Sequence, residues 1–328
     1  MFDRRKFLAA SGAVSASVLG FGRPALARQP LDSARIVVGF VAGGLSDTMA
    51  RRMADRMRGN YANAVVVENK PGASGQIANG FVKDAVADGS VLLLTHSSSL
   101  SMYPFTFKNL PYRPMEDFRP VSSACYTNHA FCVGPAVPES VRSMKDFLAW
   151  AGANPERANY GAPGVGSMPH LIMTVVNKTA GADLQPVVYK GTAAAVTDML
   201  GGQISGVSGP VGNFMPMVRS GKARLIAISG DARSSFVPDL PTYREQGFDM
   251  TAREWYGLFL PAKASDAAVQ LANKAVVAAL SDPSLVDFMK QAGADVVSCT
   301  PAQLADMLAK DTQEWRRLIK EVGFTAES

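Results

Sequence analysis

The chain is poor in cysteine and histidine, the residues that most often cross-link small exported proteins or bind metals. It contains three of each among 328 residues. The cysteines lack the CxxC spacing of zinc and redox motifs, and the histidines are scattered. The sequence therefore excludes a disulfide framework and gives no support for a metal site. The six residues are Cys125, Cys132, Cys299, His96, His129 and His170.

Two of the cysteines flank a short polar stretch. Cys125 and Cys132 lie on either side of residues 127–130, which could turn between two apolar strands and place the cysteines opposite one another. Two alternatives stay open from the sequence: an oxidised pair, or two buried thiols.

Positive charge is concentrated at the N-terminus. Arg4 and Arg5 precede an uncharged stretch, residues 9–22, and small residues lead up to Ala27. We expect residues 1–27 to be a cleaved export signal, and the arginine pair favours the twin-arginine route. A membrane helix is disfavoured because the Ser- and Gly-rich stretch is too short and too weakly apolar to span a bilayer.

Little charge remains after that segment. It carries four basic residues and one acidic residue, so its removal lowers the formal net charge from +5 to +2. A protein that binds nucleic acid is expected to gather Lys and Arg on one face, and we predict no such partner here. With 47% hydrophobic residues and no other long apolar run, residues 28–328 suit one large or two medium soluble domains in the periplasm.

Motifs of common catalytic sites are missing from the sequence. A P-loop needs a lysine after its glycine loop, and the loop at Gly43 has none. The GxSxG nucleophile elbow is absent, since glycine directly follows serine within residues 72–75 and 206–209. Asp47 could act as a general base, but a carboxylate at a helix start is more often a cap. We predict no enzyme activity, no metal and no cofactor.

Strand, glycine-rich loop and helix alternate along the chain. Residues 34–40 form an expected strand, and Met49, Met53 and Met57 mark the buried face of the helix that follows. This alternation predicts parallel α/β sheets, arranged as two lobes. Further strands are expected at residues 64–68, 91–95, 159–162, 185–189 and 225–229. Further helices are expected at 76–87, at 169–180, from Thr192 as N-cap to Gly201, and after 265 with breaks at Pro283 and Pro301.

Loops rich in Gly, Ser or Thr follow the carboxyl ends of these strands. Ligands bind outside those ends in open parallel sheets, where helix N–H groups carry partial positive charge. A carboxylate or phosphate can be held there without lysine. One such loop could be only a tight turn with a cap, but the set favours an anion site. The loops are residues 43–47, 71–76, 97–99, 164–167 and 191–192.

Several of these segments carry a family resemblance. The strongest are GFVAGGLSD at 39–47, ENKPGASG at 68–75 and YKGTA at 189–193. Together they resemble the Bug family, the extracytoplasmic solute receptors of tripartite tricarboxylate transporters. The similarity continues in order through residues 110–112, 117–121, 159–162, 200–203, 241–242 and 255–257.

The resemblance implies a type II periplasmic binding protein, a Venus flytrap with two α/β lobes and a hinge of crossing segments. The expected lobes are residues 28–124 plus 252–328, and residues 125–251. It further implies that a monomer captures a small carboxylate ligand by lobe closure and delivers it to membrane permease subunits. The alternatives are an exported hydrolase acting on an acidic substrate, and a receptor that partners a membrane sensor.

The resemblance also implies a set of ligand-binding residues, with the Phe40 ring as an apolar wall and Trp255 as a second one if it reaches the cleft. Where family members commonly have two aspartates, this chain has Ser205 and Gly209. If the second position faces the cleft, an ammonium group would lack its acceptor, so we expect simple or aromatic carboxylates rather than amino acids. The implied set is Phe40, Gly43, Gly44, Ser46, Asp47, Ser97, Ser98, Gly164, Gly166, Ser167, His170, Lys190, Gly191, Thr192 and Ser208.

Overall fold

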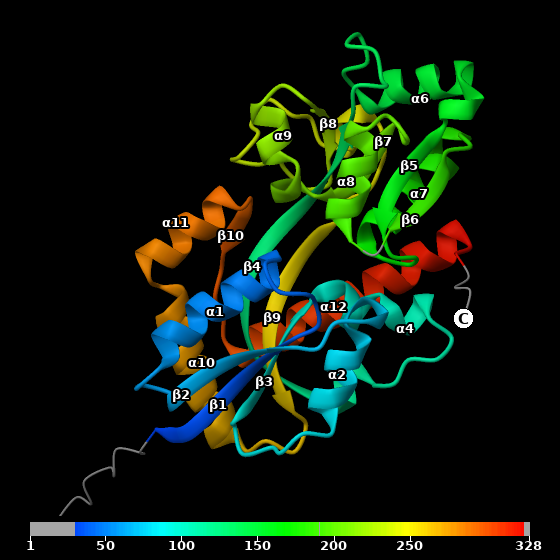
Figure 1. Cartoon of the computed structure of the whole chain (residues 1–328). Helices are drawn as coiled ribbons and strands as arrows, with labels where there is room; N and C mark the ends of the chain where they lie inside the picture. The colour runs from blue at the N-terminus through cyan, green and yellow to red at the C-terminus, as the bar shows by residue number, and fades with distance from the viewer. Residues whose placement is uncertain (1–29, 190, 325–328) are drawn as a thin grey trace, which may run out of the picture.

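Two α/β lobes lie end to end, joined by strands that run from one lobe into the other (Figure 1). The computed structural model describes residues 30–189 and 191–324, so the expected export signal and Lys190 lie outside the described residues. The hydrogen-bonded strand order is β2-β1-β3-β9-β4-β7-β5-β6, and β8 and β10 pair with β4 beside this path. This architecture confirms the expected fold class, a two-lobed α/β protein.

The sheet of lobe 1 has apolar side chains on both faces. Its strands β1, β2 and β3 are parallel, and β9 pairs antiparallel with β3. In β1, Ile36 and Val38 face one buried cluster and Val37 faces another, as the period of two requires. Helices must therefore cover both faces. The strands are β1 (Leu31–Val38), β2 (Ala62–Asn69), β3 (Val91–His96), β9 (Arg253–Pro261) and the short β10 (Ala294–Val296).

The helices of lobe 1 divide between these two faces. Met49, Met53 and Met57 of α1 are fully buried against one face, as predicted. Ala78 and Val82 of α2 pack against the other face. Helix α2 ends at Lys83, four residues earlier than expected. The helices are α1 (Leu45–Met57), α2 (Gln76–Lys83), α3 (Ser97–Ser101), α4 (Tyr103–Thr106), α5 (Pro114–Asp117), α10 (Asp266–Leu280) and α11 (Pro283–Gln291).

One long strand, β4 (Phe118–Val133), belongs to both lobes. Its first part pairs with β9, and residues 129–133 pair with β7 and β8 of lobe 2. The turn considered for residues 127–130 is therefore wrong, because both halves of one continuous strand find partners. Cys125 and Cys132 lie about 23 Å apart along it, at ~3.3 Å per residue. That spacing excludes a disulfide, and both are buried free thiols.

Lobe 2 repeats the layered arrangement around a smaller sheet. Strands β5, β6 and β7 are parallel, and β7 and β8 pair antiparallel with β4. Helices α6 and α7 contribute to the core on one face of this sheet, and α8 to that on the other. The elements are α6 (Met144–Ala153), β5 (Asn159–Pro163), α7 (Met168–Ala180), β6 (Gln185–Tyr189), α8 (Thr192–Leu200), β7 (Gly206–Pro210), α9 (Met215–Arg219) and β8 (Arg224–Ile228).

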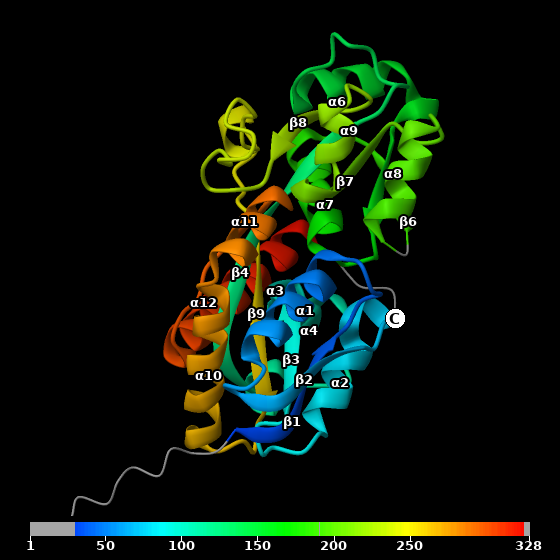
Figure 2. The same ribbon diagram turned by 60° about the vertical axis from the view of Figure 1, so that its left-hand side comes forward.

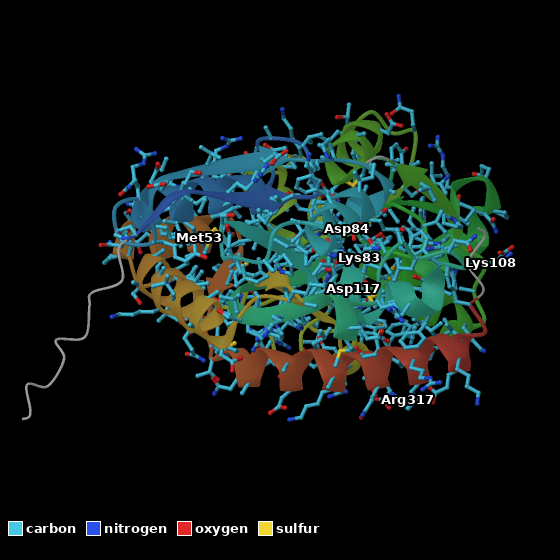
Figure 3. All side chains as sticks on the ribbon, turned by 90° about the horizontal axis from the view of Figure 1, so that it is seen from below. Met53, Lys83, Asp84, Lys108, Asp117 and Arg317 are labelled. Carbon is cyan, nitrogen blue, oxygen red and sulfur yellow. The ribbon has the colours of Figure 1, made fainter. Side chains whose placement is uncertain are left out.

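The last helix, α12 (Pro301–Val322), extends from one lobe to the other. Leu304 and Leu308 are buried in lobe 1, while Trp315 and Ile319 join the core of lobe 2. Figure 3 shows this helix in red along one side of the molecule. Together with β4 and the chain that leads into β9, it makes three connections between the lobes (Figure 2).

Candidate functional site

Loops from both lobes meet where the lobes face one another. The parallel strands of each lobe place their carboxyl-terminal loops along one edge, and Figure 1 shows the two edges turned toward each other. A Cβ atom added to Gly164 would lie 3.1 Å from Ser74 Oγ of lobe 1, and one added to Gly166 would lie 3.1 Å from Thr106 Cβ. We call this region the lobe junction. It comprises residues 40–47, 72–75, 164–167 and 191–192.

The long helices that start at the lobe junction have no side-chain cap. Gly44, Gly75 and Gly191 precede α1, α2 and α8, and glycine has no side chain to offer. Ser167 precedes α7, but its hydroxyl donates to Gly164 O (2.9 Å) instead of accepting from the helix. Such N-termini leave partly positive N–H groups available to an anion. The other long helices, α6, α10, α11 and α12, are capped by Ser143, Ser265, Asp282 and Thr300.

Asp47 anchors the loop before α1. Its buried carboxylate accepts hydrogen bonds from Gly43 N–H (2.9 Å) and Asn69 Nδ2 (2.8 Å), and pairs with Arg51 (2.9 Å). Asn69 also donates to Phe40 O (3.0 Å). Burial opposes ionisation of Asp47, but the hydrogen bonds from Arg51, Gly43 and Asn69 together lower its pKa. The ionised carboxylate therefore holds residues 40–47 in shape.

His170 has a similar place in lobe 2. The N–H of Gly166 donates to His170 Nδ1 (3.1 Å). Burial lowers the pKa of His170, which favours the neutral imidazole that can accept this bond. Gly164 and Gly166 adopt φ values of +86° and +67°, which suit glycine. Ser208 contacts the start of α7, since its hydroxyl donates to Pro169 O (2.9 Å).

The start of α8 differs from the prediction by one residue. Gly191, at φ +144°, is the N-cap, and Thr192 is the first helical residue. A Cβ on Gly209 would lie 2.8 Å from Thr192 Cγ2, so an aspartate would fit there only if Thr192 moved. Ser205 lies just before the far end of β7, where it donates to Arg157 O (2.7 Å). Only one of the two positions expected to hold aspartate is therefore next to the lobe junction.

A buried carboxylate between two histidines lies behind the lobe junction, and the sequence reasoning missed it. Glu254 Oε2 lies 3.0 Å from His129 Nε2, and Oε1 lies 3.2 Å from His96 Nδ1. Ser98 Oγ also donates to Oε1. Burial opposes ionisation of Glu254, yet its interactions with His129 and His96 hold its pKa well below its usual value. We call these residues, His96, His129 and Glu254, the His-Glu-His cluster.

The sequence carried two weak signals for this cluster. His96 directly precedes the serines at the end of β3, and Glu254 is the second residue of β9, followed by a mostly apolar run. No local pattern could bring them together, because the pairing of β3, β9 and β4 does so. The expected site residues Ser97 and Ser98 both contact the start of β9. Trp255 N–H donates to Ser97 Oγ (3.3 Å), and Ser98 Oγ donates to Glu254.

Aromatic rings surround His96. Its ring centroid lies 5.2 Å from that of Phe40, 5.8 Å from Tyr103 and 6.2 Å from Tyr256. Trp255 does not form the second wall, because it is 2% exposed in the lobe 1 core and its Nε1 donates to Asp311 (2.5 Å).

Other kinds of site find no support in residues 30–189 and 191–324. No three His, Cys, Asp or Glu side chains in that part are arranged to hold a metal ion. No helix there is both long and apolar enough to cross a membrane. A surface cavity of about 640 Å³ opens on lobe 1, away from the loops of the lobe junction. Its lining includes Lys83, Asp84 and Asp117, which Figure 3 labels.

Residues 49–324 match the tripartite tricarboxylate transporter family receptor. The chain belongs to this family. BugT of Bordetella pertussis is 29% identical to this receptor over 90% of each chain. The structure of the periplasmic binding protein BugD superposes with a TM-score of 0.81 at 30% identity, covering 90% of this chain and 99% of the other.

A third similar protein was solved with its ligand. MatC from Rhodopseudomonas palustris with bound malate has a TM-score of 0.79 and 27% identity, and covers 88% of this chain and 98% of the other. The predicted Bug resemblance is thereby confirmed, and the protein is a periplasmic solute-binding receptor of this type.

Proposed function

We propose that this receptor captures a small organic acid with one or two carboxylates by closing its lobes around it. The single observation that carries the proposal is the set of uncapped helix N-termini at the lobe junction. A carboxylate can accept hydrogen bonds from such N–H groups and complement the helix dipoles without a lysine. Malate in the similar MatC structure supports the same ligand class.

Lobe closure follows from contacts that only the closed form can make. A ligand that touches both lobes binds the closed form more tightly and shifts the population toward it. We propose that lobes 28–124 plus 252–328 and 125–251 move as units, and β4, the chain into β9 and α12 are the segments that must bend. No covalent chemistry is needed for this function.

We propose two roles for the site residues. Asp47 and His170 hold the loops of the lobe junction in shape, and Ser208 holds the start of α7, as their hydrogen bonds suggest. The remaining residues contact the ligand through N–H groups, hydroxyls or the Phe40 ring. They are Phe40, Gly43, Gly44, Ser46, Ser97, Ser98, Gly164, Gly166, Ser167, Lys190, Gly191 and Thr192.

The partner we propose is the permease of a tripartite tricarboxylate transporter, reached by a monomeric receptor exported through the twin-arginine route. The ligand is expected to lack an α-ammonium group. The glycine at position 209 provides no carboxylate, and an unpaired buried ammonium would be strongly unfavourable.

Calorimetry tests this function. Malate, succinate and benzoate are titrated into the mature protein, with the diamide of succinate and with aspartate as matched controls. We expect at least one acid to bind, the amide not to bind, and succinate to bind more tightly than aspartate. Binding only of sugars, nucleotides or cations would contradict the proposal. Mass spectrometry of natively purified protein would then identify the ligand it carries.

A further inference from the structure

His96 has a polar atom with no partner at the lobe junction. It is the last residue of β3 and is 5% exposed. Its Nδ1 lies 3.2 Å from Glu254 Oε1, within ion-pair distance, but among the described residues neither Nδ1 nor Nε2 has a hydrogen-bond partner. A Cβ on Gly75 would lie 3.7 Å from this Nε2, and the same Cβ would lie 3.8 Å from the Phe40 ring. The free edge of His96 therefore borders two loops of the lobe junction.

An unpaired polar atom is costly to bury, so the position of Nε2 calls for a partner. A ligand carboxylate held by the neighbouring helix N-termini would supply an acceptor there. The imidazole must carry a proton on Nε2 to donate to it. Because Nδ1 faces the ionised carboxylate of Glu254 and so must carry a proton as well, that state is the doubly protonated imidazolium.

Charge balance decides when His96 takes up this proton. Glu254 is one negative charge shared by two imidazoles, and one imidazolium is enough to neutralise it. A second imidazolium would be an uncompensated buried charge until another anion arrives. The groups packed around the cluster add no negative charge, because burial raises the pKa of Tyr103, Tyr256 and Cys125 and keeps them neutral.

We propose that His96 Nε2 is a carboxylate-binding group of this receptor, and that each ligand carboxylate binds there together with a proton taken from solvent. Glu254 and His129 act as positioning residues that orient the ring and supply the compensating charge. This inference rests on the proposed function, since it names the residue that meets the ligand. It makes the affinity for organic acids rise as the pH falls, by at most tenfold per pH unit for one proton.

Proton uptake is measured by calorimetry in buffers with different ionisation enthalpies, with malate and benzoate as probes. Wild-type receptor is expected to take up about 0.5 to 1 proton per ligand near neutral pH. H96Q keeps an amide donor but cannot be protonated, so it should show no uptake and about tenfold weaker binding. H129Q should also lose the uptake but should bind more tightly at neutral pH, because His96 then carries the proton of the cluster before the ligand arrives.

The outcomes separate this inference from the function it rests on. Wild-type protein that binds no carboxylate would overturn both. Carboxylate binding with the same affinity and proton uptake in H96Q would overturn only the role of His96. If H96Q does not fold, nitrogen NMR of labelled histidine in the wild-type receptor decides: one ring must change from neutral to doubly protonated when ligand is added. Unchanged histidine signals at saturating ligand would refute the inference.

Discussion

The long helices of this receptor fall into two groups that differ at their first turns. Those that start at the lobe junction follow a glycine or a serine that does not cap, whereas those that start elsewhere are capped by Ser, Asp or Thr. A side-chain cap typically stabilises a helix by about 1 kcal/mol, so four helices forgo that stabilisation at one place. The difference indicates that side-chain caps stabilise the helices elsewhere in the molecule, whereas the helices at the lobe junction keep their N–H groups for an anion.

The largest expected effect comes from giving a junction helix the cap it lacks. Gly44 has an extended conformation (φ −75°, ψ 172°), and a Cβ there would meet only Val41 O at 3.7 Å. Gly44→Asp should therefore cap α1 and keep or raise the melting temperature. Its charge would occupy the N–H groups and repel the ligand, lowering carboxylate affinity on the order of a thousandfold, or about 4 kcal/mol. Calorimetry and thermal melting measure both effects.

The control is Gly44→Asn, which has the same shape without the charge. It should lower affinity by only about tenfold, because it competes for the N–H groups but does not repel the ligand. Undiminished binding in Gly44→Asp would show that the start of α1 does not face the ligand.

A second, smaller effect is expected from Asp47, which supports the loop at that same helix start. Asp47→Ala removes the acceptor for Gly43 N–H and Asn69 Nδ2, and should lower the free energy of unfolding by about 3 kcal/mol. Denaturant titration measures this. Asp55 on the same helix pairs with Arg58 at the surface, so Asp55→Ala should cost less than about 0.5 kcal/mol. Equal losses in both variants would contradict the anchoring role.

Removing a cap from a helix outside the junction should change stability alone. Ser143 and Asp146 form a capping box at the start of α6. Ser143→Ala is expected to lower the free energy of unfolding by about 1 kcal/mol and to leave ligand affinity within twofold. A parallel loss of ligand affinity would contradict the division of the helices into a ligand-binding group and a purely structural group.

The smallest expected effect is a contribution of His170 to the pH dependence of the free energy of unfolding. Burial lowers its folded-state pKa below the ordinary value of 6.5, so the unfolded chain takes up the proton first as the pH falls. The stability that His170 contributes is therefore complete above about pH 6.5 and is lost below it. His170→Gln should lose less stability than the wild type between pH 7.5 and 5.5 in denaturant titrations.

The test compares the pH dependence of the free energy of unfolding in His170→Gln with that in the wild type. Burial raises the pKa of Asp311 to about 6, and this group works in the opposite direction, stabilising the fold as the pH falls. Its contribution cancels when variant and wild type are subtracted. An identical pH dependence in both would mean that His170 is not the group responsible.

Much of the fold could be predicted because local patterns report which faces are buried. The spacing of Met49, Met53 and Met57 predicted the buried face of α1, and the glycine loops predicted where strands give way to helices. Two local signals were overruled for the same reason. The possible turn at residues 127–130 was wrong, and the condition set for Trp255, that it reaches the cleft, is not met. Pairing with distant strands kept residues 127–130 extended and buried Trp255 in lobe 1.

The sequence by itself determined the family, the alternating α/β pattern and the loops that form the lobe junction, because each depends on residues close together in the chain. Only the tertiary structure decided that Glu254 lies between His96 and His129, and that Gly209 lies against Thr192. Those contacts join residues far apart in sequence, and they form only when β3, β4 and β9 pair and when α8 packs on β7. The physical reason is that burial and strand pairing set the surroundings of a polar side chain, and those surroundings decide whether it stabilises the fold or is left to meet a ligand.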